Sequence, residues 1–79
     1  MKFVYLVTAG TDSPTKASLP LHLAANGSLE VGHDVTVVLA GDATEMLMSD
    51  NLDQMHGVGV PPARELVAKL TDHAVPVFV

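Results

Sequence analysis

Two apolar blocks without alternation predict buried strands. Residues 3–9 (FVYLVTA) and residues 35–40 (VTVVLA) are nearly continuous apolar runs, rich in valine and aromatic residues. Strands buried on both faces, as in a parallel sheet, have this pattern, whereas a strand with one solvated face alternates. A third apolar run, residues 75–79 (VPVFV), predicts a third strand. The chain is therefore expected to contain a small parallel sheet.

Helical spacing separates the predicted strands. Between residues 16 and 31, apolar and small side chains recur at three- and four-residue steps, and Gly32 stands where a left-handed helix end is expected. Because proline lacks an N–H, Pro20 predicts that the regular helix begins near residue 18. A further helix, opened by two prolines, is expected from residue 61 onward.

The order of these elements predicts an α/β domain. Strand, helix, strand, helices, strand is the order of right-handed crossover connections. We expect a three-layer α/β/α, flavodoxin-like fold with a parallel sheet, strand order 2-1-3 and helices on both faces. Residues 1–79 form a single domain of this kind. Because nothing covers the apolar run 75–79, we expect this chain to be the N-terminal part of a longer domain.

Composition and charge remove several classes of function. Four Lys and Arg stand against nine Asp and Glu, a net charge of −5, and the cations are scattered along the chain. We therefore expect no nucleic-acid partner and no docking on an anionic membrane. No apolar run approaches the roughly 20 residues of a membrane span, and the N-terminal run is too short for a signal peptide. The expected location is the cytoplasm.

In a doubly wound sheet, ligands bind at the carboxyl ends of the strands. The expected binding residues at this edge are Thr8, Gly10, Asp12, Lys16, Gly41, Asp42 and His56. The loop GTDSPTK, residues 10–16, nearly matches a phosphate-binding loop but has Thr15 and Ala17 where that loop needs a glycine and a hydroxyl. Nucleotide hydrolysis is therefore not expected, and attraction of a small anion to Lys16 stays open.

The acidic pair and the histidines offer no catalytic or metal site. Asp42 and Glu45 have the spacing of a helix capping box, which explains both residues without acid–base chemistry. His33 and His73 are expected in helix-to-strand turns at the opposite end of the sheet, near helix C-terminal dipoles. None of the histidines has a metal-binding spacing. We expect no catalytic residue, no metal and no cofactor.

Essentially the whole chain resembles the DsrE/DsrF-like family, and three segments carry the resemblance most clearly. They are KASLPL at residues 16–21, GHDVTVVLAGDA at residues 32–43 and VPVFV at residues 75–79. The resemblance implies a flavodoxin-like subunit of a homo-oligomer, commonly a trimer or hexamer. Its best-characterised relatives carry sulfur as a cysteine persulfide, on a cysteine just after the strand equivalent to residues 75–79. This chain contains no cysteine, so it lacks the thiolate nucleophile that such a carrier needs.

The resemblance gives the leading functional expectation. The chain is expected to be an accessory subunit of an intracellular sulfur relay or of sulfur metabolism, with a sulfur-relay protein as partner. Its own contribution would be scaffold and not catalysis. Two alternatives stay open, namely a non-catalytic oligomeric binding or assembly module, and a small anion- or nucleotide-binding protein of flavodoxin-like form.

Overall fold

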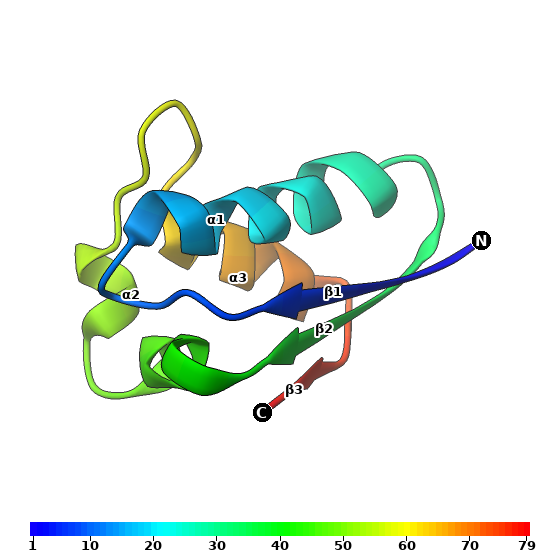
Figure 1. Ribbon diagram of the computed structural model, residues 1–79. Coiled ribbons are helices and arrows are strands. Elements are labelled where there is room, and N and C mark those ends of the chain that lie inside the picture. Colours follow the sequence, from blue (N-terminus) through cyan, green and yellow to red (C-terminus); the bar gives the residue numbers. More distant parts are fainter.

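A three-stranded parallel sheet forms one layer of the molecule. The computed structural model describes residues 1–79. The strands are β1 (Lys2–Val7), β2 (Asp34–Leu39) and β3 (Val77–Phe78), as Figure 1 shows. All six residues of β1 pair with β2, whereas β3 pairs with β2 only through Val77 and Phe78. The predicted mixed α/β structure with a three-stranded parallel sheet is confirmed.

Helical segments connect the strands. They are α1 (Pro14–Leu23), which continues as the π-helical segment η1 (Ala24–Ser28), the 3-10 helix η2 (Gly41–Leu47), the short α2 (Asn51–Gln54), and α3 (Ala63–Asp72). No helix combines the length and the apolar character needed to cross a bilayer. The helical segment from α1 through η1 and helix α3 thus lie where the sequence predicts helices.

The start of the first helix differs from the prediction. Helix α1 begins at Pro14, and Pro20 lies inside it. Pro14 is tolerated at the start because its missing N–H has no intrahelical partner there, whereas Pro20 leaves the carbonyl four residues earlier without its usual donor. The helix continues past this defect and widens into η1. Gly32 has a φ of +84°, which confirms the predicted left-handed residue at the end of the helical segment.

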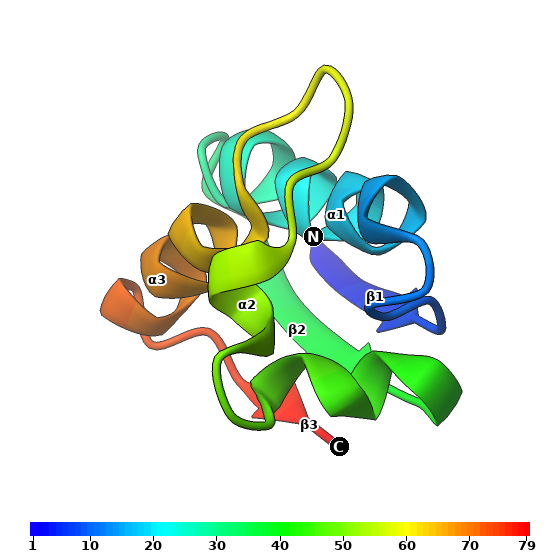
Figure 2. The ribbon, with the colours of Figure 1, turned by 90° about the vertical axis from the view of Figure 1, so that its left-hand side faces the viewer.

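The strand order is β1-β2-β3, and the expected order 2-1-3 is wrong. From β1 to β2 and from β2 to β3 the chain moves across the sheet in the same direction. Crossovers of the usual right hand then place both connecting helices on the same face. Figure 2 shows α1 and α3 together on one side of the sheet. An order of 2-1-3 reverses direction and distributes the helices over both faces, so this one difference explains why the chain forms two layers in place of three.

The core lies between the sheet and the helices. Fourteen buried apolar residues form one cluster, and the largest of them are Leu21, Met46, Met55, Leu66 and Leu70. The inward side chains of the sheet complete the cluster from below. Two of the methionines, Met46 and Met55, therefore fill the core, where their unbranched side chains fit irregular gaps.

A hydrogen bond ties the sheet to the π-helical segment. The hydroxyls of Tyr5 on β1 and Ser28 at the end of η1 are 2.5 Å apart. Ser28 is buried, so its hydroxyl cannot bond to water. The bond to Tyr5 gives this hydroxyl a partner inside the protein. The wider π turn thus coincides with the point where the first helix is anchored on β1.

Candidate functional site

The carboxyl ends of β1 and β2 bring several of the predicted binding residues together. Thr8 and Gly10 follow β1, and Gly41 and Asp42 follow β2. A Cβ placed on Gly10 would lie 2.1 Å from the backbone oxygen of Asp42, so the two loops touch at a point that only glycine fits. The contact is between backbones, and it fills the space that a ligand would need there.

The remaining predicted residues surround this contact without converging. The carboxylate of Asp12 accepts a hydrogen bond from the Gly10 N–H at 3.0 Å. Lys16 is exposed on the first turn of α1 and takes part in neither of the two ion pairs of the molecule. His56 is exposed beside Gly57, which packs against Thr15. Whether these residues bind a ligand stays a prediction.

The predicted capping box is wrong. Helix η2 begins at Gly41, so Asp42 lies inside the helix, and no side-chain hydrogen bond caps the start. The carboxylate of Glu45 instead accepts a long hydrogen bond of 3.5 Å from the Thr11 hydroxyl of the neighbouring loop. The Asp12 and Glu45 carboxylates therefore both face the loop that starts α1, which makes this edge unfavourable for an anion.

A groove of about 400 Å³ lies at the opposite, amino-terminal edge of the sheet. Its existence follows from the shortness of β3. The carbonyl of Pro76 accepts a hydrogen bond from the Val37 N–H at 2.9 Å, but Pro76 has no N–H to extend the ladder toward its own N-terminus. The first half of β2 therefore has no strand beside it on this side, and the groove opens there.

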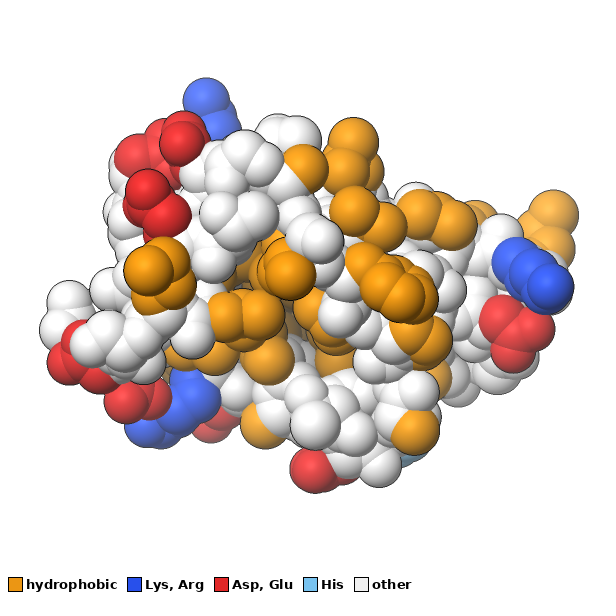
Figure 3. All heavy atoms as spheres, turned by 90° about the horizontal axis from the view of Figure 1, so that it is seen from below, with side chains coloured by type: hydrophobic (Ala, Val, Ile, Leu, Met, Phe, Trp, Pro, Cys, Tyr) orange, Lys and Arg blue, Asp and Glu red, His pale blue; other side chains and the backbone are white.

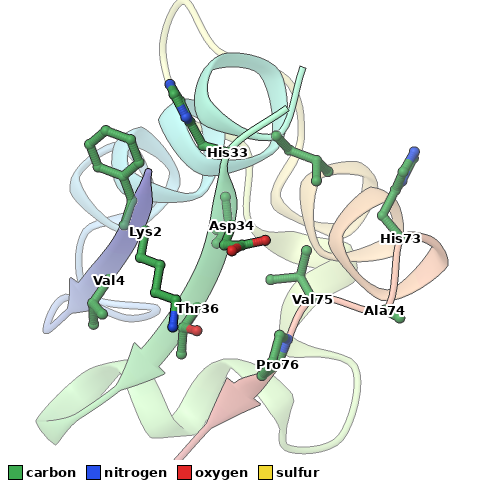
Figure 4. Close-up of a pocket in the computed structure, with 12 residues that line it drawn as sticks. Lys2, Val4, His33, Asp34, Thr36, His73, Ala74, Val75 and Pro76 are labelled. Atoms are coloured by element: carbon green, nitrogen blue, oxygen red, sulfur yellow. The ribbon is translucent and has the colours of Figure 1, made fainter. Parts of the chain in front are cut away.

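The groove has a mixed lining. His33 and His73 lie on its rim, in the helix-to-strand turns where the sequence predicts them. Figure 4 shows Asp34 pointing toward the segment at Val75, while the imidazoles of His33 and His73 stand outward. The ring of His73 is 2.9 Å from the Lys69 carbonyl in the last turn of α3, in keeping with the expected helix-end role. No three His, Asp or Glu side chains in the molecule gather closely enough to hold a metal ion.

A polar network joins η1 to α3 near this groove. The ammonium of Lys69 donates hydrogen bonds to the Asn26 side chain at 2.7 Å and to the Glu30 carboxylate. The hydrogen bond from Lys69 and the positive charge of Lys69 lower the pKa of Glu30 from its ordinary value of 4.5. Desolvation opposes this shift, and the charge of His73 makes the smallest contribution toward it. The Asn26 amide also lies 3.0 Å from the His22 ring. These contacts join η1 to α3.

The sheet face that carries no helices is the most unusual surface of the molecule. Side chains on this face are exposed, with exposed fractions of 70% for Val4, 60% for Leu6 and 58% for Phe78. We call this surface the open sheet face; its residues are Lys2, Val4, Leu6, Asp34, Thr36, Val38 and Phe78. Figure 3 shows apolar side chains gathered across the middle of the molecule on this side.

The register orders the open sheet face into rows. Leu6, Val38 and Phe78 are registered partners and form one apolar row across all three strands. Lys2 and Asp34 are partners at the amino-terminal end of the face. One end of the open sheet face thus carries two opposite charges, and the other end is apolar.

The sequence does not single out these residues as functional. The sequence does contain a signal for this surface, because strands without alternation of apolar and polar residues predict that both faces of the sheet are covered. The structure covers one face only, so the apolar side chains on the other face remain in solvent.

Comparison with known proteins gives no match, since no family model, no curated protein and no solved structure is significantly similar to the chain.

Proposed function

We propose that the chain is a non-catalytic assembly module of the DsrE-like type, which self-associates through its open sheet face. The observation that carries the proposal is the exposure of Val4, Leu6 and Phe78 on a parallel sheet. Parallel sheets are normally covered on both faces, and contiguous exposed apolar patches mark interaction surfaces. Complete burial of each such side chain contributes about 1.5–3 kcal/mol, which is a substantial drive toward assembly.

Self-association through this surface gives layers in the order helix, sheet, sheet, helix, which differs from the single-sheet, three-layer arrangement that the sequence predicts. Each chain provides one helical layer and one sheet. The segments that resemble DsrE-like proteins lie on α1, on β2 with its following turn, and around β3. They supply the scaffold of such a module.

Any role in sulfur relay would be a scaffold role. The chain contains no cysteine, and transfer of a persulfide requires a thiolate. We propose that a partner protein holds the sulfur-accepting thiolate. Incubation with a persulfide donor is therefore expected to leave the mass of the chain unchanged. An adduct of roughly 32 Da, one sulfur atom, would contradict this part of the proposal.

Light scattering on two charge variants tests self-association. Leu6→Lys places an ammonium in the apolar row, and Val31→Lys places one at a similarly exposed site outside the sheet. We expect the wild type and Val31→Lys to exceed the 8.3 kDa of one chain at micromolar concentration, and Leu6→Lys to remain at that mass. Circular dichroism confirms that both variants fold. A wild type that stays at the mass of one chain contradicts the proposal.

A further inference from the structure

A chain of hydrogen bonds runs from α1 through η1 to α3, and the group at one end fixes its direction. The side-chain oxygen Oδ1 of Asn26 accepts a hydrogen bond from the Lys69 ammonium at 2.7 Å. An ammonium can only donate, so the oxygen of the Asn26 amide has to face Lys69 and its NH2 group has to face away. The nitrogen Nδ2 of that group lies 3.0 Å from Nδ1 of His22, four residues earlier in the chain.

The same reasoning places the proton of His22. An amide NH2 group can only donate, so Nδ1 of His22 has to be the acceptor. A ring nitrogen accepts a hydrogen bond only when it carries no proton, which leaves the hydrogen of the neutral imidazole on Nε2. The contact between Asn26 and Lys69 therefore selects neutral His22, in the tautomer that has its hydrogen on Nε2.

We propose that the His22–Asn26–Lys69 chain is a pH-sensitive contact between the first helical segment and α3, and that it is complete only while His22 is neutral. A protonated imidazole has two donors and no acceptor, so no rotation of the ring restores the bond from Asn26. If the Asn26 amide turns over to offer its oxygen to protonated His22, its NH2 group faces the Lys69 ammonium and two donors meet. Protonated His22 and Lys69 thus compete for one oxygen.

The second hydrogen bond of Lys69 responds to a different range of pH. Histidine side chains change their charge between about pH 5 and pH 8. The Glu30 carboxylate also accepts from Lys69, and the pKa of Glu30 lies below its ordinary value of 4.5. Glu30 therefore stays ionised in mildly acidic solution, where histidines become protonated. Mild acid breaks the Asn26 branch of the contact and leaves the Glu30 branch in place.

No carboxylate is bonded to the His22 ring, because neither of the two ion pairs of the molecule includes a histidine. Residues four apart on a helix share a face, so α3 presents two charged side chains on the side that meets η1. The titratable side chains around this contact are Glu65 and Lys69 on that face of α3, His73 at its end, Glu30 after η1, and Tyr5 on β1, which is bonded to Ser28.

A double-mutant cycle for Asn26 and Lys69 tests the proposal. The Tm values of the wild type, Asn26→Ala, Lys69→Met and the double variant are compared at about pH 8 and about pH 5. At the higher pH, we expect the double variant to lose clearly less Tm than the sum of the two single losses, because both changes break the same bond. At the lower pH, we expect the losses to add. A coupling between the two residues that is equal at both pH values overturns the proposal.

His22→Gln is the matched control. Glutamine offers an acceptor oxygen at this position and has no proton to gain in this range of pH. We expect the same cycle in the His22→Gln background to give the same coupling at both pH values. A coupling that still falls in mild acid in this background assigns the pH dependence to another group, such as His73, and overturns the proposal.

NMR on the wild type gives a second readout that needs no substitution. We expect long-range nitrogen–proton spectra at about pH 8 to show the hydrogen of His22 on Nε2. We also expect the side-chain amide signals of Asn26 to shift together with the ring signals of His22 as the pH is lowered. A hydrogen on Nδ1 of His22, or an Asn26 amide that does not respond to the titration, overturns the proposal whether or not the variants fold.

Discussion

At the scale of single residues, the structure depends on a few contacts that sequence patterns do not reveal. Gly10 touches the Asp42 backbone because it has no side chain, and Lys69 joins Asn26 and Glu30 across two helices. The residues involved are far apart in sequence, so no local spacing predicts them. The capping box fails for the same reason, because Glu45 bonds to Thr11 of another loop and not to its own helix start.

Substitution of Gly10 tests the contact between the two loops. Gly10→Ala forces a Cβ to 2.1 Å from the Asp42 oxygen, so the loops must separate. We expect a loss of about 1–3 kcal/mol of unfolding free energy, at about 4–8 °C of Tm for each kcal/mol. Gly27→Ala is the control, because nothing lies within 4 Å of its Cβ. The control is expected to be neutral or slightly stabilising, and equal losses in the two variants would contradict the account.

The pH dependence of stability tests the Lys69–Glu30 contact. Because the pKa of Glu30 is lower in the folded protein than its ordinary 4.5, the unfolded chain binds the proton more tightly. The contact therefore stabilises the fold above the ordinary pKa, and this contribution disappears as the pH falls through the lowered value. We expect Glu30→Gln to lower Tm at neutral pH and to have little effect at strongly acidic pH. A Tm difference that is the same at both pH values would refute the assignment.

At the scale of elements, the sequence indicates whether a helix or a strand forms better than it indicates where that element begins and ends. The strands β1 and β2 are found within one or two residues of the predicted runs because a continuous run of apolar, mostly β-branched or aromatic residues is a clear strand signal. The third strand is shorter than predicted because Pro76 cannot donate to the ladder. The π-helical segment η1 has no local signal, since its wider turn is linked to the tertiary bond between Tyr5 and Ser28.

The Tyr5–Ser28 bond offers a test at this scale. Tyr5→Phe and Ser28→Ala each remove one hydroxyl of a part-buried pair that joins β1 to η1. We expect each variant to lose about 1 kcal/mol of unfolding free energy in urea titrations. The double variant should lose clearly less than the sum, because both single changes break the same bond. Strictly additive losses would show that the bond does not couple the two elements.

At the scale of the whole molecule, the sequence predicts a parallel α/β sheet but not the order of its strands. The choice between 1-2-3 and 2-1-3 depends on where α3 finds its apolar contacts, and the repeat of Leu66 and Leu70 along that helix does not specify this. The strand order in turn determines which face of the sheet is left without helices. The reversal of strand order that creates a ligand crevice in doubly wound sheets is not present in these three strands, and the predicted residues from Thr8 to Asp42 accordingly line no cavity.

The strands do not alternate apolar and polar residues, and this pattern is explained only by the whole molecule and its contacts. Val4, Leu6 and Phe78 are apolar although the chain itself buries only the opposite face of the sheet. A sheet that functions alone has polar residues at such positions. We therefore expect these side chains to be covered in the assembled protein.

Methyl NMR with a water-soluble paramagnetic agent measures this cover most directly. At concentrations where the protein assembles, we expect the methyl signals of Val4, Leu6 and Val38 to be protected from broadening, while those of Val31 and Val58 are broadened. Dilution should remove the protection from the first group alone. Methyls of Val4 and Leu6 that broaden as strongly as Val31 at every concentration would contradict the claim that the open sheet face is an assembly surface.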